Sequence, residues 1–278
     1  MNLFHAFLLG IIQGLTEFIP VSSTAHLLIA QRILNIPAGD AMFSFLVIVQ
    51  LGTIISLFAF YWKDLINIIT AVLRAIPIFI KPRNTWTFTP DAWLGFYILI
   101  ATVPALLAGY LLKDAVEALF RQPMLEASIR LFAAAILLTL AEYFSKKSRD
   151  LNSMTWLDAL FIGVMQVIAV FPGASRSGTT ISAGMFRGFD RPSAARFSFL
   201  MSVPVMLAAG GYQMLDVLKM PNLSEFLPLL AVGFITAAIV GWFAIKWLIN
   251  YLSKNSLYIF AAYCAAVAVI LLIVQAVF

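Results

Sequence analysis

The chain has 278 residues, of which 62% are hydrophobic and only 11% carry a charge. Because charged residues make up about a quarter of an ordinary soluble domain, this composition excludes a soluble globular protein and predicts an all-α, polytopic membrane protein. The net charge of +5 does not indicate nucleic-acid binding, because the lysines and arginines gather in short loops between apolar stretches. The one cysteine excludes an intrachain disulfide.

The first half of the chain is predicted to contain one bent helical hairpin and three membrane-spanning helices. The hairpin covers about residues 3–34, where Pro20 and the polar residues after it interrupt an apolar sequence. We expect this segment to enter the membrane, break near Pro20 and turn back at membrane depth, with its polar tip lining a cavity. Spans of about 20 apolar residues follow at 43–62, 93–112 and 125–144. Residues 63–81 have helical spacing that is compatible with a helix lying along the membrane surface.

The second half follows the same order. A second hairpin is predicted at about residues 156–187, with its polar break between 171 and 180. Three further spans are predicted at 197–218, 226–249 and 257–278. The whole chain, 1–278, is therefore predicted to form a single integral membrane domain with six transmembrane helices and two re-entrant hairpins.

Three sequence matches in order indicate an internal duplication. Gly10-Ile-Ile-Gln13 recurs as Gly163-Val-Met-Gln166, Ser22-Ser23 lies at the same offset from Ser175-Arg176, and Phe43-Ser-Phe-Leu46 recurs as Phe197-Ser-Phe-Leu200. The repeats would be residues 1–150 and 151–278. An odd number of crossings in each half would insert the second repeat upside down, so that the polar tips of both hairpins meet near the middle of the membrane.

The basic residues predict the orientation. With this topology most lysines and arginines, among them Lys63, Lys146, Arg187 and Lys254, share one side, whereas Lys113, Arg121 and Lys219 share the other. The positive-inside rule assigns the first group to the cytoplasm. The chain ends and the mouth of the first hairpin would then face outward.

The second break has the composition of an anion-binding loop. Glycines let backbone N–H groups approach a ligand closely, and a helix that begins near Ser177 would direct its positive end at an anion. Arg176 suits a phosphate, which accepts the guanidinium in bidentate fashion, although it could instead pair with a lipid headgroup or with Glu17. The candidate phosphate-binding residues of this break are Gly173, Ser175, Ser177, Gly178 and Thr179.

The first break adds groups that suit phosphoryl transfer. Glu17 could pair with Arg176, hold a divalent cation or accept a proton. Ser22, Ser23 and Thr24 could be no more than backbone caps of a broken helix, and a lone histidine such as His26 is more often structural than catalytic. Together, however, hydroxyls, an imidazole, a carboxylate and an arginine supply a nucleophile, a base, a metal ligand and a charge clamp. The alternative interpretation is a transporter or flippase of an anionic lipid or solute.

Gln13 and Gln166 occupy equivalent places in the two hairpins. A neutral amide at membrane depth usually makes a hydrogen bond between helices. Either amide could also orient a water molecule or a phosphate oxygen.

Two long motifs make the chain resemble the undecaprenyl-diphosphate phosphatase family, also called the bacitracin-resistance family. One is matched by Gln13 to His26, which ends in Phe-Ile-Pro-Val-Ser-Ser-Thr-Ala-His, and the other by Pro172 to Thr180. The resemblance implies a hydrolase that removes the terminal phosphate of undecaprenyl diphosphate for cell-wall synthesis. It also implies a place in the bacterial inner membrane with the site open to the periplasmic or outer side, a divalent cation (Mg²⁺ or Ca²⁺) and a possible homodimer.

The resemblance also implies roles for single residues. Ser23 would be the nucleophile and His26 the base or proton donor, with Glu17 and Arg176 completing the catalytic set. Glu17 and Gln13 would serve the metal, and Arg176, Ser175, Ser22 and Thr24 the diphosphate. Two positions depart from the family, since Gln13 stands where many members have Glu and Leu46 stands where an acidic residue is expected.

Overall fold

The computed structural model describes the chain except residues 38, 81–86, 113–122, 170–174, 221 and 278. Over the described residues the regular secondary structure is helical. Six of these helices are long and apolar enough to cross a membrane, which confirms the predicted number of spans. They are α3 (Asp40–Ala75), α4 (Pro90–Leu111), α6 (Pro123–Phe144), α9 (Arg191–Val217), α10 (Leu223–Leu252) and α11 (Tyr258–Val277). The protein is therefore a multi-pass helical membrane protein.

Helix α3 is longer than the span predicted from the sequence. It continues without a break through residues 63–75, and the short 3₁₀ helix η1 (Ile76–Ile80) follows it. Its backbone leaves helical geometry at Tyr61, where φ is −103° and ψ is 21°. The segment expected along the membrane surface is thus continuous with a spanning helix beyond its kink, and its course relative to a membrane stays a prediction.

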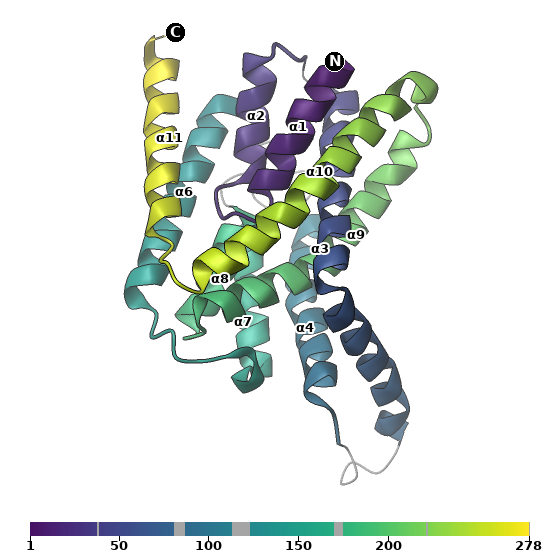
Figure 1. Cartoon of the computed structure of the whole chain (residues 1–278), viewed down its shortest axis with the longest axis vertical. Coiled ribbons are helices and arrows are strands. Elements are labelled where there is room, and N and C mark those ends of the chain that lie inside the picture. Colours follow the sequence, from purple (N-terminus) through teal and green to yellow (C-terminus); the bar gives the residue numbers. More distant parts are fainter. Residues whose placement is uncertain (38, 81–86, 113–122, 170–174, 221, 278) are drawn as a thin grey trace.

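Two short helix pairs enter the bundle from opposite ends (Figure 1). The first consists of α1 (Leu3–Thr16) and α2 (Ser23–Ile33), and the second of α7 (Trp156–Ile168) and α8 (Arg176–Phe186). Their inner ends meet in the middle of the molecule, where Arg176 at the start of α8 contacts Glu17 at the end of α1. A re-entrant course within a bilayer stays a prediction, since the structure contains no membrane.

Each short pair is packed against a helix from the other half of the chain. Helix α1 lies against α10, and α7 lies against α4. Glycines make both contacts close: a Cβ at Gly10 would lie 2.7 Å from the carbonyl oxygen of Gly233, and one at Gly163 would lie 2.4 Å from that of Ala101. These are the exchanged contacts that an inverted duplication predicts, although the repeat boundaries themselves stay a prediction.

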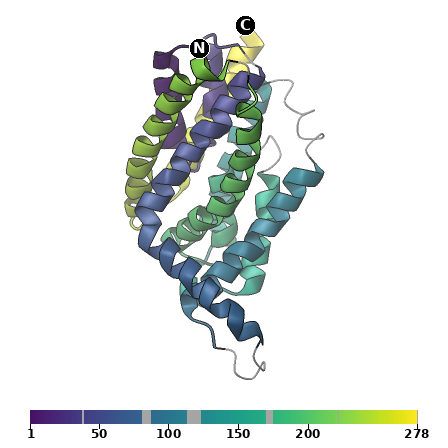
Figure 2. The ribbon, with the colours of Figure 1, turned by 90° about the vertical axis from the view of Figure 1, so that its right-hand side faces the viewer.

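At the end of the molecule opposite both chain termini (Figure 2), ion pairs around two carboxylates connect neighbouring segments of the chain. Asp158, in the first turn of α7, is fully buried and accepts hydrogen bonds from Arg149 and Arg187. Burial alone would raise the pKa of Asp158, but these hydrogen bonds outweigh it and lower the pKa. Glu142 similarly binds Arg191 and Lys147. These contacts fix the open ends of α7 and α8, and thereby the position of Arg176.

Candidate functional site

The turn of the first hairpin presents two serines at the start of α2. Ser22 precedes the helix with a positive φ of 67°, a conformation sparsely populated by residues other than glycine. Such strain, of about 1–3 kcal/mol, persists when surrounding contacts hold it. Ser23 begins the helix, and its hydroxyl is turned back toward the end of α1.

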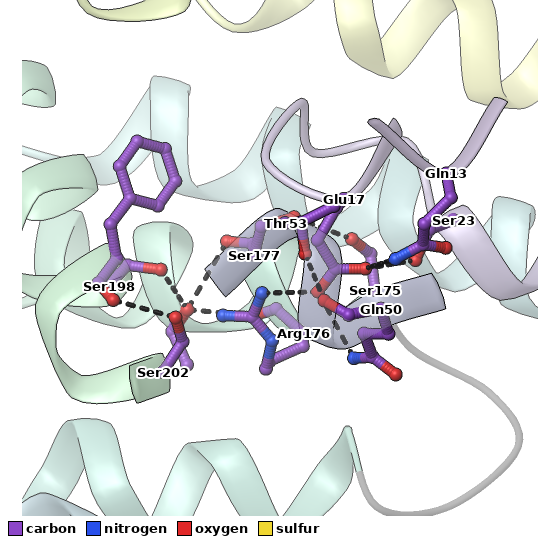
Figure 3. A network of polar contacts seen from close by, with 12 residues as sticks. Gln13, Glu17, Ser23, Gln50, Thr53, Ser175, Arg176, Ser177, Ser198 and Ser202 are labelled. Atoms are coloured by element: carbon purple, nitrogen blue, oxygen red, sulfur yellow. Dashed lines mark hydrogen bonds and ion pairs between the residues drawn. The ribbon is translucent and has the colours of Figure 1, made fainter. Parts of the chain in front are cut away.

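Glu17 is the centre of the polar network between the hairpins (Figure 3). It is 4% exposed. Its Oε2 accepts hydrogen bonds from Nε2 of Gln13 at 2.7 Å and from Oγ of Ser23 at 2.8 Å. Its Oε1 accepts from Nη2 of Arg176 at 2.6 Å and from Nε2 of Gln50 at 3.3 Å. The carboxylate therefore joins a candidate nucleophile to the candidate phosphate-binding arginine.

Arg176 reaches this network because α8 begins at the tip of the second hairpin. Ser175 caps the helix, and its hydroxyl accepts the backbone N–H of Gly178 at 3.1 Å. Ser177 lies against the first hairpin, where its hydroxyl donates to the carbonyl oxygen of Ile19 at 3.4 Å. The positive end of α8 and the guanidinium thus lie on the same side of the site.

A cavity of about 220 Å³ lies between the two tips. This is smaller than the roughly 300–1,000 Å³ of pockets that enclose drug-sized ligands, so it suits a headgroup rather than a long lipid tail. Its polar lining comprises Glu17, Ser22, Ser23, Thr24, Gln50, Arg130, Gln166, Ser175, Arg176 and Ser177. The structure thus brings together most of the residues that the sequence singles out.

A family model described as "Bacitracin resistance protein BacA" matches residues 6–270. This chain belongs to that family. Proteins named undecaprenyl-diphosphatase are similar over nearly their whole length. The protein from Mycobacterium leprae is 38% identical over 100% of this chain and 96% of its own length. The one from Rubrobacter xylanophilus is 40% identical over 96% of both chains, and the one from Methanobrevibacter smithii is 38% identical over 97% and 96%.

His26 lies outside the cavity lining, contrary to its expected place beside Ser23. Its Nδ1 contacts the carbonyl oxygen of Ser22 at 2.9 Å, and its Nε2 contacts the hydroxyl of Tyr263 at 2.8 Å. Because a carbonyl oxygen can only accept, Nδ1 carries the proton, and in the neutral ring Nε2 accepts from Tyr263. Both ring nitrogens are thus engaged in holding the turn against α11. The catalytic role of His26 stays a prediction that this geometry does not support.

Two residues of the predicted phosphate-binding loop do not line the cavity, and the structure does not describe a third. Thr179 is fully buried and does not line the cavity. Gly178 does not line the cavity either, and its N–H donates to the hydroxyl oxygen of Ser175. Gly173 lies outside the described residues.

The predicted divalent cation does not fit Glu17 and Gln13 as they are arranged. Each oxygen of Glu17 already accepts two hydrogen bonds, and Gln13 presents a donor to it. Arg176 adds positive charge at the same carboxylate. Over the described residues, moreover, no group of three or more His, Cys, Asp or Glu side chains could hold a metal. The cation stays a prediction.

Sequence reasoning missed two residues of the cavity. Arg130, on α6, is 5% exposed and lines the cavity, and Gln50, on α3, contacts Glu17. The available signal was an arginine inside an otherwise apolar predicted span, because ionisable residues in such spans face protein or a polar cavity.

Proposed function

We propose that this chain hydrolyses undecaprenyl diphosphate to undecaprenyl phosphate and inorganic phosphate, and so regenerates the lipid carrier for cell-wall synthesis. Membership of the BacA family and the undecaprenyl-diphosphatases among its relatives support the reaction. The observation that carries the proposal is the group formed by Ser23, Glu17 and Arg176. This group combines a hydroxyl nucleophile, a carboxylate that contacts the hydroxyl, and a guanidinium group that can bind the phosphate.

Substrate binding would exchange the partner of Arg176. Its Nε and Nη1 are buried and have no hydrogen-bond partner among the described residues. These donors, with Nη2, suit the oxygens of a diphosphate, which guanidinium groups bind in bidentate fashion. As Arg176 turns to the phosphate, Glu17 loses its cationic partner and retains the hydrogen bond from Ser23.

The chemical step then follows from the contact between Ser23 and Glu17. The Ser23 oxygen forms a bond to the terminal phosphorus while the bond from that phosphorus to the bridging oxygen breaks, and Glu17 takes the hydroxyl proton. Undecaprenyl phosphate leaves with the bridging oxygen. Arg176 and the N-terminus of α8 stabilise the charge on the transferring group. Water subsequently attacks the phosphorus of the phosphoserine, the bond from phosphorus to Oγ of Ser23 breaks, and Glu17 returns its proton to that oxygen as phosphate leaves.

Direct attack by water on the same phosphorus is the alternative course, with Ser23 holding the substrate. A single-turnover reaction stopped with acid distinguishes the two. Phosphate bound covalently to Ser23 supports the serine mechanism, and its absence while product forms contradicts that mechanism.

The proposed location is the bacterial inner membrane, with the lipid tail between helices and the site open to the outer side. Among the described residues, basic side chains such as Lys146, Arg187 and Lys254 belong to the connections opposite the two termini. The positive-inside rule supports a cytoplasmic position for that end. Labelling of single cysteines introduced at Asn2 and Lys254, in intact cells, would test this orientation.

The deciding experiment measures phosphate release from undecaprenyl diphosphate by the purified protein in detergent. We expect Ser23→Ala and Arg176→Ala to reduce the rate by about 10³-fold or more, because each removes a group that acts on the transferring phosphoryl. Ser253→Ala and Arg74→Ala, at exposed positions, are the matched controls. Full release by both site variants would refute the assignment. A lipid transporter or flippase, by contrast, would move the lipid without releasing phosphate.

A further inference from the structure

Gln166, near the end of α7, is a buried amide that has no hydrogen-bond partner in the part of the chain that the structure describes. It is 2% exposed, and neither its Nε2 nor its Oε1 has a partner among the described residues. Buried polar atoms in native proteins are nearly always hydrogen-bonded, so an exception calls for an explanation. The side chain lines the same cavity as Ser23 and Arg176. Its unused donor and acceptor are therefore available to a ligand in that cavity.

Comparison with the equivalent residue of the first hairpin, Gln13, explains why the amide of Gln166 lacks a partner among the described residues. Gln13 donates to Glu17, which lies one helical turn later. The position that corresponds to Glu17 in the second hairpin is occupied by Val170. Gln166 thus has the place of Gln13 without a carboxylate to receive its amide. Gln13 thus donates to a protein carboxylate, whereas the described residues offer Gln166 no such group.

The chemistry of the cavity indicates what Gln166 binds. Arg176 and Arg130 both line it, while Glu17 already accepts four hydrogen bonds. A cavity with two guanidinium groups and a carboxylate already in use favours an anion with several oxygens. An amide adds a donor to such an anion and an acceptor for a water molecule bound to it.

We propose that Gln166 binds the diphosphate headgroup directly, with Nε2 donating to a phosphoryl oxygen and Oε1 accepting from a water held beside that oxygen. This inference rests on the proposed function for the identity of the substrate. The contact forms in the bound substrate and persists during reaction. Gln166 is thus a substrate-binding residue, and its loss raises KM rather than lowering kcat.

The test compares Gln166→Leu, which removes a buried amide, with a control that removes a buried hydroxyl likewise lacking a partner among the described residues. Ser182→Ala is that control, because the Ser182 hydroxyl is buried in α8, has no partner among the described residues and does not line the cavity. For Gln166→Leu we expect KM for undecaprenyl diphosphate to rise about 10- to 100-fold, as for a lost hydrogen bond to a charged group. We expect its kcat to stay within about threefold of wild type and its thermal midpoint not to fall. Ser182→Ala should leave both KM and the thermal midpoint near wild type or the midpoint slightly higher.

A second variant and a binding measurement keep the test decisive. Gln166→Glu retains the shape and the acceptor but removes the donor and adds negative charge, so its KM should rise more than that of Gln166→Leu. Pyrophosphate should raise the thermal midpoint of the wild-type protein and raise that of both variants less. If Gln166→Leu melts earlier while KM and the pyrophosphate shift stay at wild-type values, the amide is structural and the inference is wrong.

The same data separate this inference from the proposed function. Wild-type protein that releases no phosphate from undecaprenyl diphosphate contradicts the proposed function. If its pyrophosphate shift still depends on Gln166, the anion site stands without that reaction. Wild-type protein that releases phosphate with a KM insensitive to Gln166→Leu contradicts the inference alone.

Discussion

The two hairpins share a frame but place their buried carboxylates at opposite ends of it. Helix α1 is capped by Asn2, which accepts the backbone N–H of His5, and α7 is capped by Thr155, which accepts that of Asp158. His5 and Asp158 are thus equivalent by position. The second hairpin has its carboxylate in the first turn, where it binds arginines, whereas the first has Glu17 at the tip beside Ser23.

This difference teaches how one supersecondary unit can serve two purposes. A carboxylate at the open end, held by two arginines, fixes a hairpin to its surroundings. A carboxylate at the tip, held by exchangeable partners, faces a cavity and a nucleophile. Neutralising the two carboxylates in turn should therefore impair different properties, activity in one case and stability in the other.

Among the changes that compare the two hairpins, the largest effect is expected for Glu17→Gln. An amide accepts a hydrogen bond but is not a base for the Ser23 proton, so phosphate release should fall by about 10²- to 10⁴-fold. The measurement is the rate at saturating substrate, on protein whose folding has been checked by its thermal midpoint. Glu225→Gln, at an exposed site in the first turn of α10, is the matched control. Unchanged activity in Glu17→Gln would remove the proposed role of this carboxylate.

Asp158→Asn should instead lower the free energy of unfolding. It leaves Arg149 and Arg187 without the charge that both now bind, and breaking a buried ion pair in this way costs about 3–5 kcal/mol. Since both guanidinium groups are partly exposed, we expect the lower end of this range. Urea-induced loss of activity in detergent measures the change, and the remaining folded protein should keep a near wild-type kcat. A selective loss of kcat would contradict the comparison.

The lowered pKa of Asp158 adds a pH dependence with a definite sign. The contribution of the ion pairs is fully present above the pKa of an unfolded aspartate, about 3.9. It is lost as the pH falls below that value through the lower pKa of the folded protein. The thermal midpoint of the wild type should therefore fall more steeply below pH 4 than that of Asp158→Asn.

The smallest effect is expected on stability, from substitutions of the glycines through which the hairpins pack against neighbouring helices. Gly163→Ala would press a methyl group against the backbone of Ala101, and Gly10→Ala against that of Gly233. Each should destabilise by about 1–3 kcal/mol, with the larger loss for Gly163→Ala because its contact is closer. Gly211→Ala in α9, where nothing lies within 4 Å of the added Cβ, should be neutral or stabilising. Equal tolerance of all three would contradict the close packing of the hairpins.

Much of this arrangement was predictable because it depends on local sequence patterns. Apolar stretches of span length gave the six spanning helices, and Pro20 with its polar neighbours marked the first turn. The contact between Glu17 and Arg176 followed from the repeat, since an inverted duplication brings both tips together.

The rest depends on contacts between distant parts of the chain. Nothing near His26 in the sequence reveals that its hydrogen-bond partner is Tyr263, which lies 237 positions later. Arg130 belongs to a span whose other residues are mostly apolar, so its inward direction emerges from the packing of α6. The ion pairs of Asp158 likewise depend on how the connection after α6 folds back to α7.

Each hairpin packs against a helix from the other half of the chain, and this has a consequence for biogenesis. The ribosome completes α1 almost at once, yet the helix that receives its glycine face, α10, is synthesised near the end of the chain. During most of synthesis the first hairpin therefore lacks its final neighbour, and Glu17 and Ser23 belong to a hairpin whose main packing partner is still missing. A chain that ends before α10 would leave the glycine face of α1 without the helix that covers it.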